Sequence, residues 1–192
     1  MELIFATNNR NKAIEIQRIL PAAIKVFTLE DVGIGEDIPE EQDTLQGNAS
    51  QKAHYVYERL HKDCFADDTG LEIEELKGAP GVISARYAGA DKNPEANMDK
   101  VLDEMKNLKN RKARFRTVIS LIHQGRELFF EGIVNGYILK EKRGDEGFGY
   151  DPIFLPEGYD LSFAQMPLDL KNQISHRSRA VRKLADYLAQ HT

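Results

Sequence analysis

The sequence predicts a mixed α/β protein. In its first half, short apolar runs typical of buried strands alternate with stretches whose apolar residues recur at helical spacing. In its second half, two β-rich stretches meet at the dipeptide Gln124-Gly125, a pattern of antiparallel neighbours. A chain of 192 residues can bury a substantial core, either as one large domain or as two small lobes.

Composition and charge exclude several classes of protein. Hydrophobic residues make up 41% of the chain and charged residues 30%, which is ordinary for a globular protein. The net charge of −5 argues against a general nucleic-acid surface. No apolar run approaches the roughly 20 residues that span a membrane, and the start lacks the pattern of a signal peptide. A single cysteine, Cys64, excludes an internal disulfide. We therefore expect a cytoplasmic enzyme.

The first elements form a candidate anion site. Residues 3–6 predict a strand, residues 7–12 a polar turn, and the apolar spacing that follows predicts a helix over about 12–20. A donor-rich turn at the start of a helix is suited to binding negative charge. Asn8 or Asn9 is also expected to cap the helix, and the two roles do not exclude one another.

An acidic loop follows a short strand expected over residues 24–27. Residues 36–43 hold five carboxylates in eight positions, a pattern usually found in a solvated loop. The alternative is that one or two of them complete a divalent-metal site, because Mg²⁺ takes a few hard oxygen ligands.

A helix over about 45–60 comes next, with Asp43 or Thr44 as its cap. Lys52 lies beside the apolar stripe of this helix. It points either into a cleft or out to water, as most helix lysines do.

The segment around Asp67 and Asp68 organises the predicted site. An apolar run over residues 64–66 predicts a short buried strand, which Thr69-Gly70 is expected to break before alternation resumes over residues 71–74. Neighbouring side chains of a strand point to opposite faces, so one aspartate should face the site and the other a structural partner. A buried carboxylate must be paired, hydrogen-bonded or bound to metal. The alternative is an ordinary Asp-Thr-Gly turn.

Regular elements dominate the next part of the chain. Residues 78–81 predict a turn, and a strongly amphipathic helix is expected over about 94–109 behind the cap Asn93. Two long strands are expected over residues 114–122 and 128–139.

A glycine-rich loop over residues 144–152 carries two aromatics, Phe148 and Tyr150. Loop glycines allow close backbone approach to a ligand, and exposed aromatic rings offer faces on which a base can stack. The alternative is a tight turn whose aromatics fold into the core. Residues 153–155 predict another strand.

The C-terminal part adds cations. A short helix over residues 168–173 carries Lys171, and a final helix over about 176–189 begins with His176 and Arg177. Cations are disfavoured at the positive end of a helix dipole, which makes this pair a site candidate. An ordinary surface arginine is the alternative.

Together these features supply what triphosphate cleavage requires: a phosphate-binding turn, carboxylates for a metal, an aromatic loop and a basic trio, Lys12, Lys52 and Lys171. The motifs resemble those of the inosine/xanthosine triphosphate pyrophosphatases, which remove non-canonical purine nucleotides from the precursor pool. The matching segments, in the family's order over nearly the whole chain, are Thr7-Asn8-Asn9-Arg10-Asn11-Lys12, Asn48-Ala49, Ala66-Asp67-Asp68-Thr69-Gly70-Leu71, Gly78-Ala79-Pro80-Gly81, Ser84-Ala85-Arg86-Tyr87, Gly147-Phe148-Gly149-Tyr150-Asp151-Pro152 and Ser175-His176-Arg177.

The resemblance implies an elongated, two-lobed α/β/α fold with a long central mixed sheet and a substrate cleft between the lobes, within a single domain over residues 1–192. It implies a homodimer that uses Mg²⁺ to convert ITP, dITP or XTP to the monophosphate and pyrophosphate, without nucleic-acid or membrane partners. Two rival functions stay open: a pyrophosphatase for other modified nucleotides, and a non-catalytic nucleotide sensor.

The resemblance also assigns roles to residues. Asp68 is the metal-bound acid and general base, Lys52 a second catalytic residue, and Glu40 is favoured over Glu41 as the other metal ligand. The ordinary pKa of an aspartate, about 3.9, suits a ligand better than a base at pH 7, so the alternative is that Asp68 chiefly holds the metal and orients water. Asn8 replaces the family's usual glycine. The substrate-binding residues implied are Thr7, Asn8, Asn9, Arg10, Asn11 and Lys12 for the phosphates, Thr69, and, for the base, Phe148, Gly149, Tyr150, Asp151, Lys171, His176 and Arg177.

Overall fold

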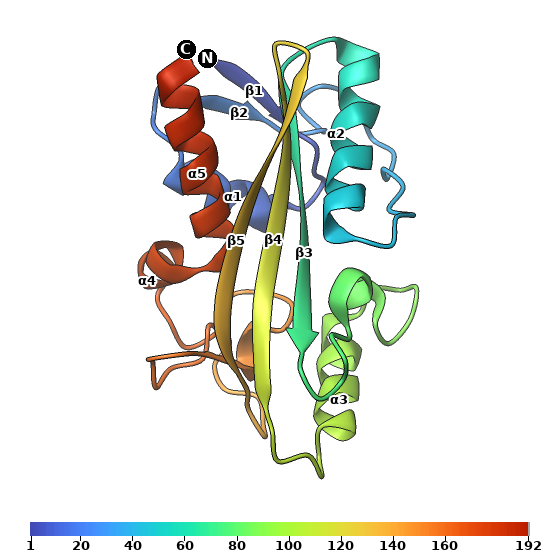
Figure 1. The fold of residues 1–192 in the computed structure, drawn as a ribbon, viewed down its shortest axis with the longest axis vertical. Helices are drawn as coiled ribbons and strands as arrows, with labels where there is room; N and C mark the ends of the chain where they lie inside the picture. The colour runs from blue at the N-terminus through green and yellow to red at the C-terminus, as the bar shows by residue number, and fades with distance from the viewer. Residues whose placement is uncertain (192) are drawn as a thin grey trace. The chain divides into compact units, whose positions relative to one another are not determined.

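The structure, a computed structural model, describes residues 1–191 and contains a six-stranded mixed sheet with helices beside it (Figure 1). The strands lie in the order β2-β1-β3-β4-β5-β6; β1 is parallel to β2 and β3, and β5 is antiparallel to β6. The mixed α/β prediction is confirmed.

The strands are β1 (Glu2–Phe5), β2 (Lys25–Phe27), β3 (Cys64–Ile73), β4 (Lys112–His123), β5 (Arg126–Ile138) and β6 (Phe154–Pro156). The helices are α1 (Arg10–Ile19), α2 (Leu45–Leu60), α3 (Pro94–Glu104), α4 (Leu168–Ile174) and α5 (His176–His191).

The chain forms two compact units. Unit 1 holds residues 1–68, 117–132 and 176–191 of the described chain, and unit 2 holds residues 69–116 and 133–175. Strands β3, β4 and β5 each contribute residues to both units. The division within β3 falls directly after Asp68.

Unit 1 has a separate core on each face of its strands. Leu3 and Phe5 of β1 pack into a cluster with apolar residues of α1 and α5, and the Phe5 ring stacks on Phe65 at 4.5 Å. Ile4 and Ala6 pack instead with residues of α2. This alternation follows from the two-residue period of a strand, and it assigns each residue of β1 and β3 to one helical layer.

Unit 2 is built around aromatic side chains. Phe115 of β4 lies 4.6 Å, between ring centroids, from Phe154 of β6, and Phe163 packs on both. Apolar residues of α3 and the end of β3 complete this core. A 3₁₀ helix, Gly81–Arg86, contacts α3.

Three predicted boundaries differ from the structure. The prediction that Thr69-Gly70 breaks the strand is wrong, because β3 runs unbroken from Cys64 to Ile73. Helix α1 begins at Arg10, so Lys12 lies in its first turn. Helix α3 ends at Glu104, five residues early, because the turns after it keep later apolar residues against the same core and so extend the apolar spacing beyond the helix.

The hairpin between β4 and β5 turns at Gln124 and Gly125, as predicted. Their φ angles are 50° and 75°, the pair of positive values that a tight two-residue hairpin turn requires.

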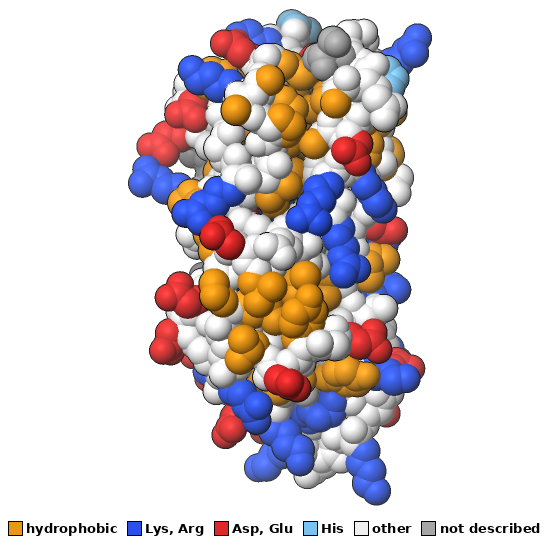
Figure 2. Space-filling model, turned by 90° about the vertical axis from the view of Figure 1, so that its left-hand side faces the viewer, with side chains coloured by type: hydrophobic (Ala, Val, Ile, Leu, Met, Phe, Trp, Pro, Cys, Tyr) orange, Lys and Arg blue, Asp and Glu red, His pale blue; other side chains and the backbone are white. Residues whose placement is uncertain are grey.

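Among residues 1–191, no helix combines the length and apolarity needed to cross a membrane. Figure 2 shows one face of the molecule, on which charged side chains of both signs are scattered among hydrophobic ones.

Candidate functional site

Asp67 and Asp68 point to opposite faces of β3, as the alternation predicts. Asp67 lies on the side of α1 and α5, where the Lys12 ammonium donates to its Oδ1 at 3.0 Å and Arg177 Nε to its Oδ2 at 3.5 Å. Asp68 lies on the side of α2, where Asn48 Nδ2 donates to its Oδ2 at 3.1 Å and Lys52 Nζ is 4.0 Å from its Oδ1. Both aspartates are buried, at 1% and 7% exposed.

The pKa values of the two carboxyls are therefore shifted in opposite directions. Burial opposes the ionisation of Asp67, but the charges of Lys12 and Arg177 outweigh it and hold the pKa of this carboxyl below its usual value. Burial raises the pKa of Asp68, because the cations Lys52 and Lys12 compensate it only in part. Asp67 is thus favoured as an anion, whereas Asp68 has the higher proton affinity of the two.

Lys52 connects two acceptors beside Asp68. Its side chain is buried, and its ammonium lies 2.6 Å from Glu40 Oε1 and 2.8 Å from the carbonyl oxygen of Asp67. Burial lowers the pKa of Lys52, but the carboxylates of Asp68 and Glu40 outweigh this and raise it above its usual value. Lys52 is therefore a buried cation, and the reading that it merely reaches water is wrong.

Glu41 has different neighbours from Glu40. Its backbone N–H donates to Gln51 Oε1 at 3.1 Å, and Gln51 Nε2 lies 3.5 Å from its carboxylate, in an exposed setting. Of the two glutamates, Glu40 is the one held by Lys52 near Asp68.

The carboxylates present fit a metal shared with a substrate. In the part of the chain that the structure describes, no group of three or more His, Cys, Asp or Glu side chains is arranged to hold a metal ion. Glu40 and Asp68 both approach Lys52. Mg²⁺ is typically bound through one or two carboxylates together with phosphate oxygens and water, so Glu40 and Asp68 are the candidate ligands.

The turn before α1 is ordered by its own side chains. Asn9 caps the helix, with its Oδ1 accepting from the backbone N–H groups of Asn11 and Lys12 at 3.0 and 3.2 Å. Thr7 Oγ1 accepts from the N–H of Asn9 at 3.1 Å. Of the predicted phosphate-binding residues, Thr7 and Lys12 are the least exposed, and Lys12 reaches the acids directly.

Asn8 and Arg10 lie apart from the aspartates. Asn8 Nδ2 is 3.5 Å from the carbonyl oxygen of Glu36, and Arg10 forms an ion pair of 3.1 Å with Glu30 on the surface. Asn11 is also exposed, so all three lie on the outer side of the turn.

Arg177 is held by an acid that the sequence reasoning missed. Its Nη1 donates to the carboxylate of Glu15, on α1, and Glu15 is only 4% exposed. With Lys12 and Asp67, the two residues form a buried chain of alternating charges. The available signal was position, because Glu15 stands directly before the core residue Ile16 and three residues after Lys12. His176, beside Arg177, is also buried at the start of α5.

The glycine-rich loop forms a second cluster, within unit 2. Asp151 Oδ2 accepts from the backbone N–H of Phe148 and from the ammonium of Lys171, both at 2.8 Å. The same ammonium lies 4.8 Å from the centroid of the Phe148 ring. A cation over an aromatic face stabilises both groups, and the buried ion pair fixes the loop around Asp151.

Gly147 makes this arrangement possible. Its φ is +79°, and a Cβ there would lie 2.2 Å from Asp151 Oδ2. Any other residue would displace the carboxylate that holds the loop together.

The two aromatics of the loop differ in burial. Tyr150 is 6% exposed and its hydroxyl donates to the carbonyl oxygen of Ser84 at 2.6 Å, so the expectation of a ring folded into the core holds for Tyr150. Phe148 is half-buried, and so is Thr69 at the start of unit 2.

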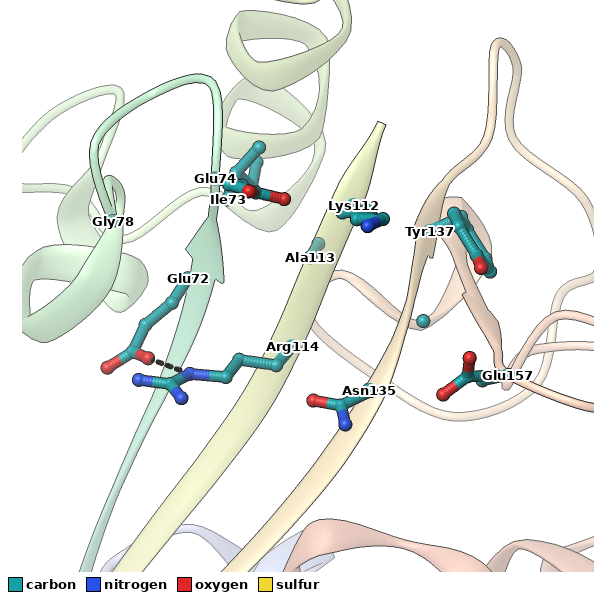
Figure 3. A pocket seen from close by; sticks show the side chains of 11 residues that line it. Glu72, Ile73, Glu74, Gly78, Lys112, Ala113, Arg114, Asn135, Tyr137 and Glu157 are labelled. Atoms are coloured by element: carbon teal, nitrogen blue, oxygen red, sulfur yellow. Dashed lines mark hydrogen bonds and ion pairs between the residues drawn. The ribbon is translucent and has the colours of Figure 1, made fainter. Parts of the chain in front are cut away.

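A separate pocket of about 550 Å³ lies on the outer face of the strands of unit 2. Figure 3 shows Glu72 and Arg114 pointing toward one another across its wall, joined by an ion pair. None of the predicted site residues lines this pocket.

Comparisons with known proteins agree over nearly the whole chain. Residues 3–187 match the model of the Ham1 family. The chain is 54% identical to a dITP/XTP pyrophosphatase of Flavobacterium psychrophilum, with 97% of this chain and 98% of the relative covered. It is 44% identical to a dITP/XTP pyrophosphatase of Bacillus subtilis, with 97% and 96% covered.

Solved structures agree as well. The Ham1 protein of Staphylococcus aureus superposes with a TM-score of 0.91 at 37% identity, with 100% of both chains covered. A Mycobacterium abscessus structure described as a nucleoside-triphosphatase / dITP/XTP pyrophosphatase gives a TM-score of 0.78 at 34% identity, with 96% of this chain and 98% of that chain covered.

Proposed function

The chain belongs to the Ham1 family, and from this premise we propose that it hydrolyses non-canonical purine nucleoside triphosphates, namely ITP, dITP and XTP, to the monophosphate and pyrophosphate. The relatives named dITP/XTP pyrophosphatase support the substrate class. The resemblance drawn from the motifs is therefore confirmed, and the proposal extends over a single catalytic domain.

The observation that carries the proposal is the buried acidic cluster of unit 1. It combines one aspartate whose pKa is lowered with a second whose pKa is raised, beside the buried Lys52 and the partly buried Lys12. A non-catalytic sensor has no need of two adjacent buried carboxylates beside a buried lysine. The cluster therefore favours hydrolysis over mere binding.

We assign the attack to a water molecule oriented by Asp68. Asp68 Oδ1 accepts the proton as the water oxygen bonds to the α-phosphorus, and the bond between that phosphorus and the bridging oxygen breaks to release pyrophosphate. Lys52 and Lys12 compensate charge on the phosphates, with Thr7 and Asn9 shaping the turn that receives them. Asn8, Arg10 and Asn11, on the outer part of that turn, are proposed to bind the phosphates as well.

Glu40 and Asp68 are the residues that would hold Mg²⁺. When bound, the ion would neutralise phosphate charge and polarise the bond that breaks. The contact of Lys52 with Glu40, and the exposed setting of Glu41, support Glu40 as the second ligand.

The aromatic loop is proposed to receive the base. Phe148 offers a partly exposed ring, while Asp151 and Lys171 place an acceptor and a donor beside it. The resemblance adds Thr69, Gly149, His176 and Arg177 to the substrate contacts, and Tyr150 to the loop that forms the base site. It also supports a cytoplasmic homodimer, and we include both properties in the proposal.

A substrate panel tests the function. Release of pyrophosphate is measured for ITP, dITP, XTP, ATP, GTP and several modified pyrimidine triphosphates at one Mg²⁺ concentration, with Asp68→Asn as the inactive control. We expect kcat/KM to be highest for the three non-canonical purines. A preference for a modified pyrimidine would replace the substrate class, and binding without turnover would identify a sensor.

A further inference from the structure

Ser84 joins three segments of unit 2. Its hydroxyl oxygen accepts from the backbone N–H of Leu71 in β3 at 2.9 Å and donates to the carbonyl oxygen of Gly81 at 2.6 Å. Its own carbonyl oxygen accepts from the Tyr150 hydroxyl at 2.6 Å. One residue of the 3₁₀ helix therefore connects β3 with the glycine-rich loop.

These contacts are sheltered from water. Ser84 and Tyr150 are each 6% exposed, and Leu71 is fully buried. A buried hydroxyl or carbonyl that loses its partner is costly, because water does not replace it. The hydrogen bond from the Tyr150 hydroxyl to the Ser84 carbonyl oxygen, here called the bridge, is therefore not replaced by hydrogen bonds to water.

The loop needs such an anchor. Two of its residues, Gly147 and Gly149, have φ angles of +79° and +64° and leave the backbone with little intrinsic preference. Asp151 fixes the inner shape of the loop through Phe148 and Lys171. Tyr150 adds a tie from the loop to the 3₁₀ helix, by way of Ser84.

On the other side of the bridge lies the segment of β3 that follows the acids. Leu71 is two residues beyond Thr69, the proposed substrate contact, and its N–H is held by Ser84. A shift of the 3₁₀ helix would therefore move Tyr150 and disturb Leu71 together.

We propose that Ser84 and Tyr150 are positioning residues, whose bridge holds the base-binding loop in register with the strand that carries Thr69. This rests on the proposed function. Tyr150 acts through its hydroxyl, while Phe148 offers the exposed ring to the base. The bridge places the ring before substrate arrives, so its loss weakens substrate binding rather than the chemical step.

Kinetics of Tyr150→Phe test this role. The variant keeps the ring and removes only the hydroxyl, and we expect KM for ITP to rise roughly five- to tenfold, the worth of one buried hydrogen bond, while kcat stays within about twofold. Tyr137→Phe is the matched control, because Tyr137 is in the same unit but 39% exposed on β5. An unchanged KM, or a fall in kcat alone, would overturn the proposal.

A second readout does not depend on hydrolysis. The chain has no tryptophan, so Phe148→Trp places a single fluorescent reporter in the loop. In this background, we expect Tyr150→Phe to raise the acrylamide quenching constant of Trp fluorescence by about twofold or more and Tyr137→Phe to leave it unchanged. Equal quenching in all three proteins would refute the bridge.

The two readouts separate the two proposals. If wild-type protein released no pyrophosphate from any purine triphosphate, the proposed function would fail, while the quenching experiment would still decide whether Tyr150 holds the loop. Should Tyr150→Phe not fold, Ser84→Ala in the reporter background takes its place, because it removes the hydroxyl that holds Leu71 of β3 to the 3₁₀ helix and keeps the carbonyl oxygen that accepts from Tyr150. Increased quenching then supports the bridge, and unchanged quenching refutes it.

Discussion

At the scale of single residues, two adjacent aspartates with the same chemistry receive different surroundings. Asp67 is fixed between Lys12 and Arg177, while Asp68 faces Asn48 and Lys52. The difference arises only from the alternation of a strand, and it allows the role of each acid to be tested separately.

Asp68→Asn is expected to remove most activity and to leave the fold intact. The change deletes the proposed acceptor of the water proton and a proposed carboxylate for the metal, so kcat should fall by about 100-fold or more, equivalent to roughly 2.7 kcal/mol. Hydrolysis of ITP and the circular dichroism spectrum are measured together. Activity within threefold of wild type, about 0.7 kcal/mol, would contradict the assignment.

Glu15→Gln is expected to lower stability. The substitution keeps the shape of the side chain but removes the charge that faces the buried Arg177, and the free energy of unfolding should fall by about 1 to 3 kcal/mol. Urea denaturation measures the change. Glu30→Gln is the control, because its ion pair with Arg10 is exposed and should contribute little.

Arg177→Ala tests base reading. An arginine has only donors, which suit the keto group of inosine or xanthosine and not the amino group of adenine. We expect kcat/KM to fall more for ITP and XTP than for ATP, with all three measured at one Mg²⁺ concentration. Equal losses would mean that Arg177 serves only to hold Asp67 and Glu15.

At the scale of elements, the loop before α2 and the glycine-rich loop each owe their geometry to one charged residue in a neighbouring helix. Lys52 of α2 holds Glu40, and Lys171 of α4 holds Asp151. In both cases a buried cation on a helix holds a carboxylate of an irregular segment. Substitutions in these two loops are therefore expected to have effects that follow from the contact with that cation.

Glu40→Gln is expected to weaken the dependence on Mg²⁺ more than Glu41→Gln does. Glu40 lies beside Lys52 and Asp68, whereas Glu41 faces Gln51 in an exposed setting. Activity is measured against Mg²⁺ concentration for both variants. A raised Mg²⁺ requirement in Glu41→Gln alone would reverse the choice.

Gly147→Ala should destabilise the protein more than Gly149→Ala. Both positions have a positive φ, so both variants carry backbone strain, but only at Gly147 would a Cβ meet the Asp151 carboxylate. Thermal unfolding compares the two. A smaller loss of thermal stability in Gly147→Ala than in Gly149→Ala would mean that the contacts of Asp151 with Phe148 and Lys171 do not stabilise the protein.

At the scale of the whole molecule, stability should depend on pH through Asp67. Its folded pKa lies below the usual value of about 3.9, so its contribution is present above that pH and is lost as pH falls toward the folded pKa. We expect Asp67→Asn to be less stable than wild type at neutral pH, with a difference that narrows below about pH 4. A constant difference would show that Asp67 is not the linked group.

The fold and part of the site follow from local patterns in the sequence. The alternation of side chains along β3 predicts that Asp67 and Asp68 point to opposite faces. Asn9, which caps α1, is one of the two asparagines expected to do so. Glu15 could not be predicted as a buried residue, because a glutamate on a helix ordinarily faces water and its partner Arg177 is distant in the sequence. Gly70 predicts a break by composition, yet β3 continues through it.

The two cores of unit 1 make β3 intolerant of a change in length. Cys64 and Ala66 belong to the core with α2, and Phe65 belongs to the core with α1 and α5. Inserting or deleting one residue ahead of the acids would therefore turn each aspartate side chain to the opposite face of the strand. Asp67 would then face Lys52, and Asp68 would face Arg177. Evolution of this strand can therefore proceed by substitution but not by single-residue insertion or deletion.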